Sequence, residues 1–200
     1  MGLALTAVTV SSCNEKESNL TLDYTQFVNP FIGTDFTGNT YPGAQVPFGM
    51  VQLSPDNGLP GWDRIAGYFY PDSTIAGFSH THLSGTGAGD LYDISFMPVT
   101  LPYNEAEQPL GIHSKFSHEK ESAYAGYYQV FLQDYKINVE LTATERCGIQ
   151  RYTFPKAESA IFLNLKKAMN WDETQDSYIG QVDSVTLKGY RSVSYTHLRA

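Results

Sequence analysis

The sequence predicts an all-β fold, an antiparallel β-sandwich made of many short strands joined by long loops rich in Gly and Pro. Its 200 residues are 42% hydrophobic and 17% charged, which is enough to bury the core of one domain, and its 14 Tyr and 11 Phe favour strands. In the first half, Gly and Pro recur every few residues and no apolar pattern of period 3.6 lasts three turns. In the second half, apolar and polar residues alternate with a period of two.

Taken in order, the first half is expected to contain short strands and ordered loops from Tyr24 to Asp56, and no helices. One strand is predicted from Thr74 to Leu83. Another is predicted from Ile94 to Leu101, where Pro102 ends it because proline cannot donate a ladder hydrogen bond. Residues 104–109 have the composition of an exposed loop.

The second half is predicted to form half-buried antiparallel strands, each with apolar residues on one face. The apolar sets are Tyr128, Val130 and Leu132; Val139, Leu141 and Ala143; and Ile161, Leu163 and Leu165. A further strand is predicted from Asp183 to Tyr190, and Cys147 is expected to be a small buried thiol in a strand.

The N-terminal segment is predicted to lie outside the domain. Met1 to Ser12 is apolar and too short to span a bilayer, and the residues before Cys13 resemble a bacterial lipobox, although the usual basic start is missing. We therefore expect residues 1–19 to be a lipoprotein signal peptide and linker, with lipidation at Cys13 and a location in the bacterial periplasm or on the outer-membrane surface. N-myristoylation at Gly2 is a weaker alternative, because it leaves Cys13 unexplained.

The net charge of −8 at pH 7 excludes a nucleic-acid partner and an anionic membrane surface, because no basic run offsets the acids. Any membrane contact is then expected through the lipid anchor only. A neutral or cationic ligand fits this charge better.

The stretch from Gly77 to Asp90 is the strongest candidate for a functional site. If the preceding strand continues through it, His80 and His82 share one face, and Gly85 and Gly87 then permit close approach to the backbone. Short side chains on turns, Asn39 and Asp90, are weaker members, and the upstream ring of Trp62 could stack on a sugar.

Three interpretations of this stretch compete. The two histidines could be hydrogen-bonded core residues beside a tight turn, which is the commonest explanation of an isolated His-x-His pattern. They could bind a transition metal together with Asp90 or Asp93, although no third histidine lies at a suitable spacing. They could also recognise sugar hydroxyls while nearby aromatic rings cover apolar sugar faces.

Several blocks in a fixed order resemble the N-terminal domain of glycoside hydrolase family 92, and the resemblance runs from Tyr24 to Arg191. The blocks are Asn29–Thr34, Gly38–Ala44, Pro47–Asp56, Ala66–Tyr70 and Gly77–Gly87. The resemblance implies an exo-acting, inverting, calcium-dependent α-mannosidase that acts on mannose-containing glycans. It also implies that the general acid, the general base and most calcium ligands belong to a C-terminal helical barrel domain that is missing from this chain.

The sequence itself offers no trusted pair of catalytic carboxylates. Asp90 and Asp93 lie close together, and Glu105, Glu107, Glu119 and Glu121 lie in polar segments where solvated side chains are expected. We therefore expect the chain to be a fragment that is inactive alone, with residues 20–192 forming the domain that shapes the substrate pocket. Residues 193–200 depart from the family pattern.

Two alternatives to an enzyme domain remain, a free-standing carbohydrate-binding module and a purely structural β-sandwich. A bare apolar, aromatic-rich surface would favour the enzyme domain or the structural domain, because it would be the missing interface. A narrow pocket ringed by Trp62, His80 and His82 would favour the binding module.

Overall fold

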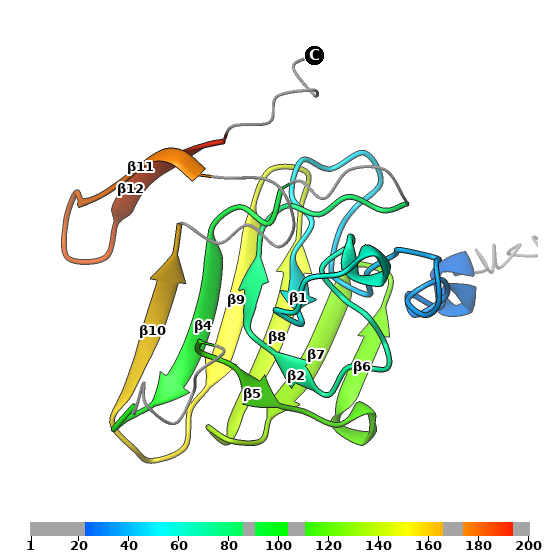
Figure 1. Cartoon of the computed structure of the whole chain (residues 1–200), viewed down its shortest axis with the longest axis horizontal. Coiled ribbons are helices and arrows are strands. Elements are labelled where there is room, and N and C mark those ends of the chain that lie inside the picture. Colours follow the sequence, from blue (N-terminus) through cyan, green and yellow to red (C-terminus); the bar gives the residue numbers. More distant parts are fainter. Residues whose placement is uncertain (1–22, 86–90, 104–110, 166–173, 194–200) are drawn as a thin grey trace, which may run out of the picture.

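The computed structural model of the chain describes residues 23–85, 91–103, 111–165 and 174–193, and it confirms the all-β class. Two four-stranded antiparallel sheets form the body of the molecule (Figure 1). The first has the strand order β1-β3-β4-β10, and the second has the order β6-β7-β8-β9. The first sheet comprises β1 Ser54–Asp56, β3 Gly77–Ser79, β4 Ser95–Thr100 and β10 Ser159–Asn164, and the second comprises β6 Glu121–Tyr124, β7 Tyr127–Leu132, β8 Ile137–Ala143 and β9 Gly148–Thr153.

The second sheet follows the predicted alternation. On β7 and β8 every second residue is buried, and the two strands pair in a register that places Val130 opposite Val139. Opposed β-branched residues on one face stabilise an antiparallel pair. A turn of two residues joins β6 to β7, and its second residue, Gly126, has a φ of +79°, which glycine adopts without steric cost.

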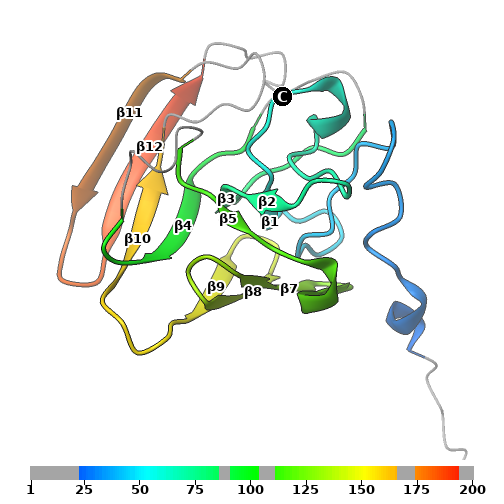
Figure 2. The same cartoon turned by 60° about the horizontal axis from the view of Figure 1, so that its bottom comes forward.

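The core lies between the two sheets, whose layers are seen nearly edge on in Figure 2. Phe78 and Val99 from the first sheet belong to one buried cluster with Tyr128, Val130 and Leu141 from the second. Removing each such side chain from water contributes about 1.5–3 kcal/mol to folding. This shared core makes the two sheets a β-sandwich and fixes the positions of the loops at their ends.

Smaller elements flank the sandwich. β2 (Thr74–Ile75) pairs with β5 (Ser114–Lys115), and a C-terminal hairpin consists of β11 (Thr174–Gln181) and β12 (Leu187–Val193). The only helices in the described ranges are short 3-10 helices, η1 (Tyr24–Phe27), η2 (Trp62–Arg64) and η4 (His118–Lys120). Across those ranges, no helix has the length and apolar character needed to cross a membrane.

The single strand predicted from Thr74 to Leu83 is divided in the structure. Its first part is β2, which pairs with β5, whereas its second part is β3, which pairs with β1 and β4. The chain bends at Ala76 because the two parts belong to different sheets, and Ala76 donates its amide to the carbonyl of Asp56 instead of continuing one ladder. His80 and His82 therefore follow the end of a strand and are not on it.

Two other local predictions are wrong. Cys147 is exposed in the connection between β8 and β9, because the strand that was predicted to contain it begins at Gly148. The strand predicted from Asp183 to Tyr190 begins at Leu187 as β12, since the residues before it form the turn of the hairpin, where Val182 donates its amide to the carbonyl of Thr186.

Candidate functional site

Four connecting segments come together beyond the strand ends, and we call them the loop cluster: residues 38–43, 61–67, 80–85 and 91–94. The amide of Gly85 donates to the carbonyl of Asn39 at 2.6 Å, and the amide of His80 donates to the carbonyl of Asp93 at 3.0 Å. Gly67, at a φ of +87°, lies so close to His82 that an added Cβ would meet the imidazole Cδ2 at 3.1 Å. The folded chain thus joins segments that are far apart in sequence.

His82 belongs to the loop cluster and is 3% exposed. Its Nδ1 lies 2.8 Å from the carbonyl of Gln52, and its Nε2 lies 2.9 Å from Asp56 Oδ1. Ser79 Oγ also lies 3.2 Å from Nε2, so both ring nitrogens have partners within hydrogen-bond distance. In this arrangement neither nitrogen is open to a metal ion or a sugar hydroxyl, so the geometry favours the hydrogen-bonded core interpretation for His82.

His80 is in a different position, because its ring is only partly buried. Its Nδ1 lies 2.9 Å from the carbonyl of Ile94 and must donate to it, which makes Nε2 the acceptor of the neutral ring. Burial lowers the pKa of His80 below its ordinary value and so favours that neutral form. His80 therefore keeps a nitrogen that can accept a hydrogen bond from a hydroxyl group.

The other predicted site residues are brought together only in part. Asn39 and Gly85 meet through their backbones; Asn39 has a φ of +49°, and its buried Oδ1 has no partner within the described residues. Gly85 has a φ of +94° and open space around the position of a Cβ, so a ligand can approach its backbone. Trp62, at the start of η2, is 54% exposed. Gly87 and Asp90 lie outside the described residues.

The segment after residue 90 is strained and tightly held. Leu91, Tyr92 and Ile94 have positive φ values of 80°, 60° and 55°, which are rare for residues other than glycine and rarest for a β-branched one such as Ile94. Asp93 holds this segment because it accepts a hydrogen bond from Thr81 Oγ1 at 2.9 Å and forms an ion pair with Arg191 of β12. With its carboxylate in these contacts, Asp93 is poorly placed to complete a metal site.

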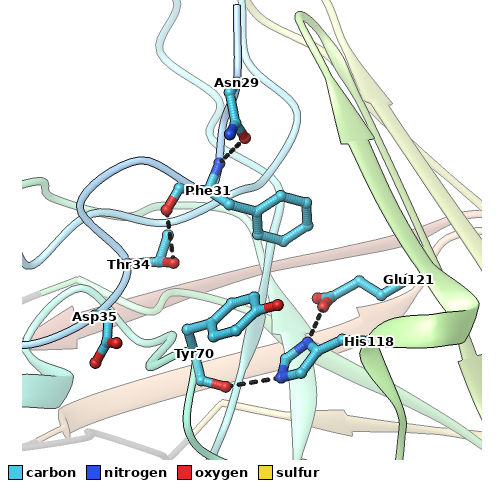
Figure 3. Close-up of a pocket in the computed structure, with 7 residues that line it drawn as sticks. All are labelled: Asn29, Phe31, Thr34, Asp35, Tyr70, His118 and Glu121. Carbon is cyan, nitrogen blue, oxygen red and sulfur yellow. Dashed lines mark hydrogen bonds and ion pairs between the residues drawn. The ribbon is translucent and has the colours of Figure 1, made fainter.

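Sequence reasoning missed a second site, which is shown in Figure 3. It is a pocket of about 320 Å³, and we call it the aromatic pocket. Its lining residues are Asn29, Phe31, Thr34, Asp35, Tyr70, His118 and Glu121. Tyr70 and His118 stack with ring centroids 3.9 Å apart, and Phe31 meets Tyr70 edge to face at 6.0 Å. The pocket unites three segments that are distant in sequence, so no local motif reveals it.

Glu121 corrects the expectation of a solvated carboxylate, because its side chain is 1% exposed. It accepts hydrogen bonds from the hydroxyl groups of Tyr128 at 2.6 Å and Tyr68 at 3.0 Å, and it pairs with His118 Nδ1 at 2.6 Å. Burial and the nearby carboxylate raise the pKa of both tyrosines, which keeps them protonated as donors. A signal was available: Glu121 shares with Ala123 the inward face of β6.

The model of the glycosyl hydrolase family 92 N-terminal domain matches residues 27–197 and therefore includes most of the tail that departs from the expected pattern. A secreted glycosidase of Arthroderma benhamiae, described as uncharacterized, is 27% identical over 143 residues, which are 66% of this chain and 18% of that protein.

Solved structures of the family resemble the fold closely. A family 92 α-mannosidase from Bacteroides thetaiotaomicron, solved in complex with mannoimidazole, is 40% identical with a TM-score of 0.78, covering 84% of this chain and 23% of its own. An inverting mannosidase of the same family from the same organism is 31% identical with a TM-score of 0.57, covering 73% of this chain and 20% of its own. The chain thus spans about a quarter or less of these relatives. It belongs to glycosyl hydrolase family 92, as that family's N-terminal domain.

Proposed function

We propose that this chain is the domain that shapes the substrate pocket in an exo-acting, inverting α-mannosidase of mannose-containing glycans. The observation that carries the proposal is the 40% identity, at a TM-score of 0.78, to an α-mannosidase solved with mannoimidazole. The inverting mannosidase of the same family adds support for the stereochemical outcome. The loop cluster supplies a rigid framework on which such a pocket can be built.

The chemistry is proposed to need a second domain. Inversion requires an acid and a base roughly 6.5–9.5 Å apart on opposite sides of the sugar, with a water molecule between them. The two most buried carboxylates described, Asp56 and Glu121, are both held by histidines and carry no open oxygen pair for such a task. We infer that a C-terminal helical domain provides the acid and the base.

Most of the calcium ligands of the complete enzyme are likewise proposed to lie outside this chain. The residues that the structure describes include no group of three His, Cys, Asp or Glu side chains that could hold a metal ion. Calcium prefers six to eight oxygen ligands, and the Asp93 carboxylate of the loop cluster is already held by Thr81 and Arg191. The role proposed for this domain is therefore to orient the sugar and exclude water.

A bare apolar groove favours docking to a partner domain over a free-standing binding module. The groove has a volume of about 640 Å³ and is lined by Val28, Ile32, Tyr41, Val46 and Tyr124 among others. Ile32, one of these residues, is 74% exposed. A contiguous apolar surface of this kind is typical of a protein interaction site. The binding-module alternative expected His82 in an open pocket, whereas His82 is buried.

Within the loop cluster, Trp62, His80, Asn39 and Gly85 are the proposed sugar contacts, and His82 is proposed to position them. An exposed indole can cover an apolar sugar face, a neutral imidazole nitrogen can accept from a hydroxyl, and the open backbone at Gly85 permits close approach. Gly87 and Asp90 stay in the proposal on the strength of the sequence alone.

The protein is proposed to work outside the cytoplasm. Its Arthroderma relative is described as secreted, and Cys13 follows an apolar leader. If Cys13 is lipidated, Cys13→Ala should move the protein from the membrane to the soluble fraction. An intact, unmodified Met1 found by mass spectrometry on protein made from the native gene would contradict this localisation.

The decisive experiment compares the complete protein with the 200-residue chain on an aryl α-mannoside, with and without calcium. The complete protein should hydrolyse it in a calcium-dependent manner and release the β-anomer first, as NMR of the fresh product will show. The isolated chain should give no turnover. Turnover by the isolated chain that survives repurification, or initial release of the α-anomer, would contradict the proposal.

A further inference from the structure

We propose that the aromatic pocket binds one neutral sugar residue as a second carbohydrate site. Its seven lining residues include none from the loop cluster, so it is a separate place on the domain. The volume of about 320 Å³ lies at the lower end of the range for small-molecule sites. The proposed function suggests mannose as the first sugar to try, whereas the pocket itself rests only on the contacts below.

The first argument is the rigid aromatic wall. Tyr70 is 38% exposed, its ring stacks on His118, and Phe31 packs against it edge to face. The His118 imidazole cannot rotate without losing hydrogen bonds, because its Nδ1 lies 2.6 Å from Glu121 and its Nε2 lies 2.8 Å from the carbonyl of Tyr70. A wall whose rings are already ordered offers an apolar sugar face a surface that costs little conformational entropy on binding.

The second argument is that the pocket offers both hydrogen-bond donors and acceptors (Figure 3). Asn29 Oδ1 accepts from the amide of Phe31 at 3.0 Å, which leaves the side-chain amino group to donate. Asp35 Oδ1 accepts from the amide of Phe36 at 2.7 Å, which leaves its second oxygen to accept. Together with the Tyr70 hydroxyl, which can do both, these groups match the mixed donors and acceptors of sugar hydroxyls.

The third argument is charge, which separates a neutral ligand from charged ones. Glu121 is compensated by His118 and by two tyrosine donors, so Asp35 is the remaining negative group of the lining. An anion such as phosphate would be repelled by Asp35. A cation over Tyr70 would need a carboxylate oxygen beside that ring, and the oxygens of Glu121 are occupied by His118 and the two tyrosine hydroxyl groups. A neutral polyol avoids both conflicts.

The test uses the complete protein and measures retention on soluble α-mannan by affinity electrophoresis beside hydrolysis of an aryl α-mannoside. Tyr70→Leu, which removes the ring, should weaken retention about tenfold, and Asp35→Asn, which replaces the accepting oxygen, by about fivefold. Both variants should keep aryl mannoside hydrolysis within about twofold of the wild type, as should the control Tyr178→Phe on the hairpin, which should also keep full retention.

The outcomes separate this inference from the proposed function. If the wild type fails to hydrolyse the mannoside, the proposed function fails, and retention on mannan, glucan and galactan still tests the pocket. Unchanged retention of both variants on every glycan that retains the wild type would overturn the inference, and so would no retention of the wild type on any of them. An equal fall in retention and hydrolysis would also overturn it, because the pocket would then belong to the catalytic site. If choline or inorganic phosphate, but no free sugar, competed with the glycan and reduced retention, the pocket would bind a charged ligand and the inference would be wrong.

Discussion

The loop cluster and the aromatic pocket contain the same local chemistry in two settings. In each, a histidine lies between a carboxylate and a backbone carbonyl: His82 between Asp56 and Gln52, and His118 between Glu121 and Tyr70. The side chain of His82 is 0% exposed, whereas that of His118 is 34% exposed. The pair of His82 and Asp56, which is sealed from water, thus supports the interior. The pair of His118 and Glu121, which is open on one side, lines a pocket.

The difference shows why residue type alone did not locate the site. Removing one partner of a polar pair sealed in the interior strongly destabilises the protein, because the other partner is left buried without compensation. A pair at the rim of a pocket can be rehydrated after the same change. Substitutions at the two histidines should therefore show which pair supports the interior and which lines the pocket.

Removing the His82 side chain should have the largest effect. His82→Ala should lower the free energy of unfolding by about 3–5 kcal/mol, because the buried Asp56 carboxyl group loses its histidine partner. Denaturant unfolding of the chain measures this, and His118→Ala, at the partly exposed pair, should cost clearly less.

Adding Asp56→Ala to His82→Ala should recover part of the loss, since the double variant no longer buries an unpaired carboxyl group. If His82 instead contacts the sugar directly, His82→Ala should leave stability unchanged and lower kcat/KM of the complete enzyme tenfold. That result would contradict the structural role of His82.

The next largest effect on stability is expected from the partners of Glu121, the buried carboxylate of the aromatic pocket. Glu121 depends on the hydroxyl groups of Tyr68 and Tyr128 as well as on His118. Tyr68→Phe and Tyr128→Phe should each lower the free energy of unfolding by about 1.5–3 kcal/mol, the usual contribution of a hydrogen bond to a charged group. Tyr24→Phe, at an exposed ring, is the matched control. Equal stabilities for all three variants would mean that the buried carboxylate needs no tyrosine donors.

Trp62 should behave in the opposite way to His82. Because its ring is exposed, Trp62→Ala should change the stability of the chain little. In the complete enzyme the same change should lower kcat/KM about tenfold, which corresponds to about 1.4 kcal/mol of transition-state stabilisation. Phe36→Ala, which removes another exposed ring, serves as the control. A stability loss at Trp62 without a kinetic change would assign it to packing.

The smallest effect is a pH dependence at His80. Burial is the main cause that lowers its pKa, and the hydrogen bond to the carbonyl of Ile94 opposes this shift. The neighbouring His82 lowers the pKa further, and Asp56 raises it. Because the folded-state pKa lies below the unfolded value near 6.5, the stabilising contribution is complete above that pH and is lost as the pH falls through the folded value. The difference in unfolding free energy between wild type and His80→Gln, followed from pH 7.5 to 5, should shrink on acidification. A difference that grows on acidification would mean that folding raises the pKa of His80 instead of lowering it.

Much of the fold follows from sequence periodicity. The alternation in β7 and β8 and the end of β4 before Pro102 were predictable because each depends on local pattern and on proline chemistry. The division of the Thr74 to Leu83 segment was not, because it depends on which strands pair with β2 and β3. Register and pairing are decided by contacts between residues distant in sequence.

The site was predictable only in outline for the same reason. The glycine-rich stretch indicated a place where loops converge, and Asn39 and Gly85 do meet there. The orientation of each imidazole depends on partners such as Gln52 and Ile94, which nothing local connects to the histidines. The aromatic pocket lies between three distant segments, so it becomes visible only in the folded chain.

The strand β10 has a consequence for handling the chain outside its complete protein. It forms one edge of the first sheet among the described residues, and its six residues, Ser159–Asn164, carry no charge and no proline. Ile161 is 49% exposed on it. An uncharged apolar edge of this kind offers unpaired backbone groups to a second copy of itself and is a template for aggregation. We expect the isolated domain to associate through this edge as its concentration is raised, and Ile161→Lys to increase the concentration at which it stays in solution.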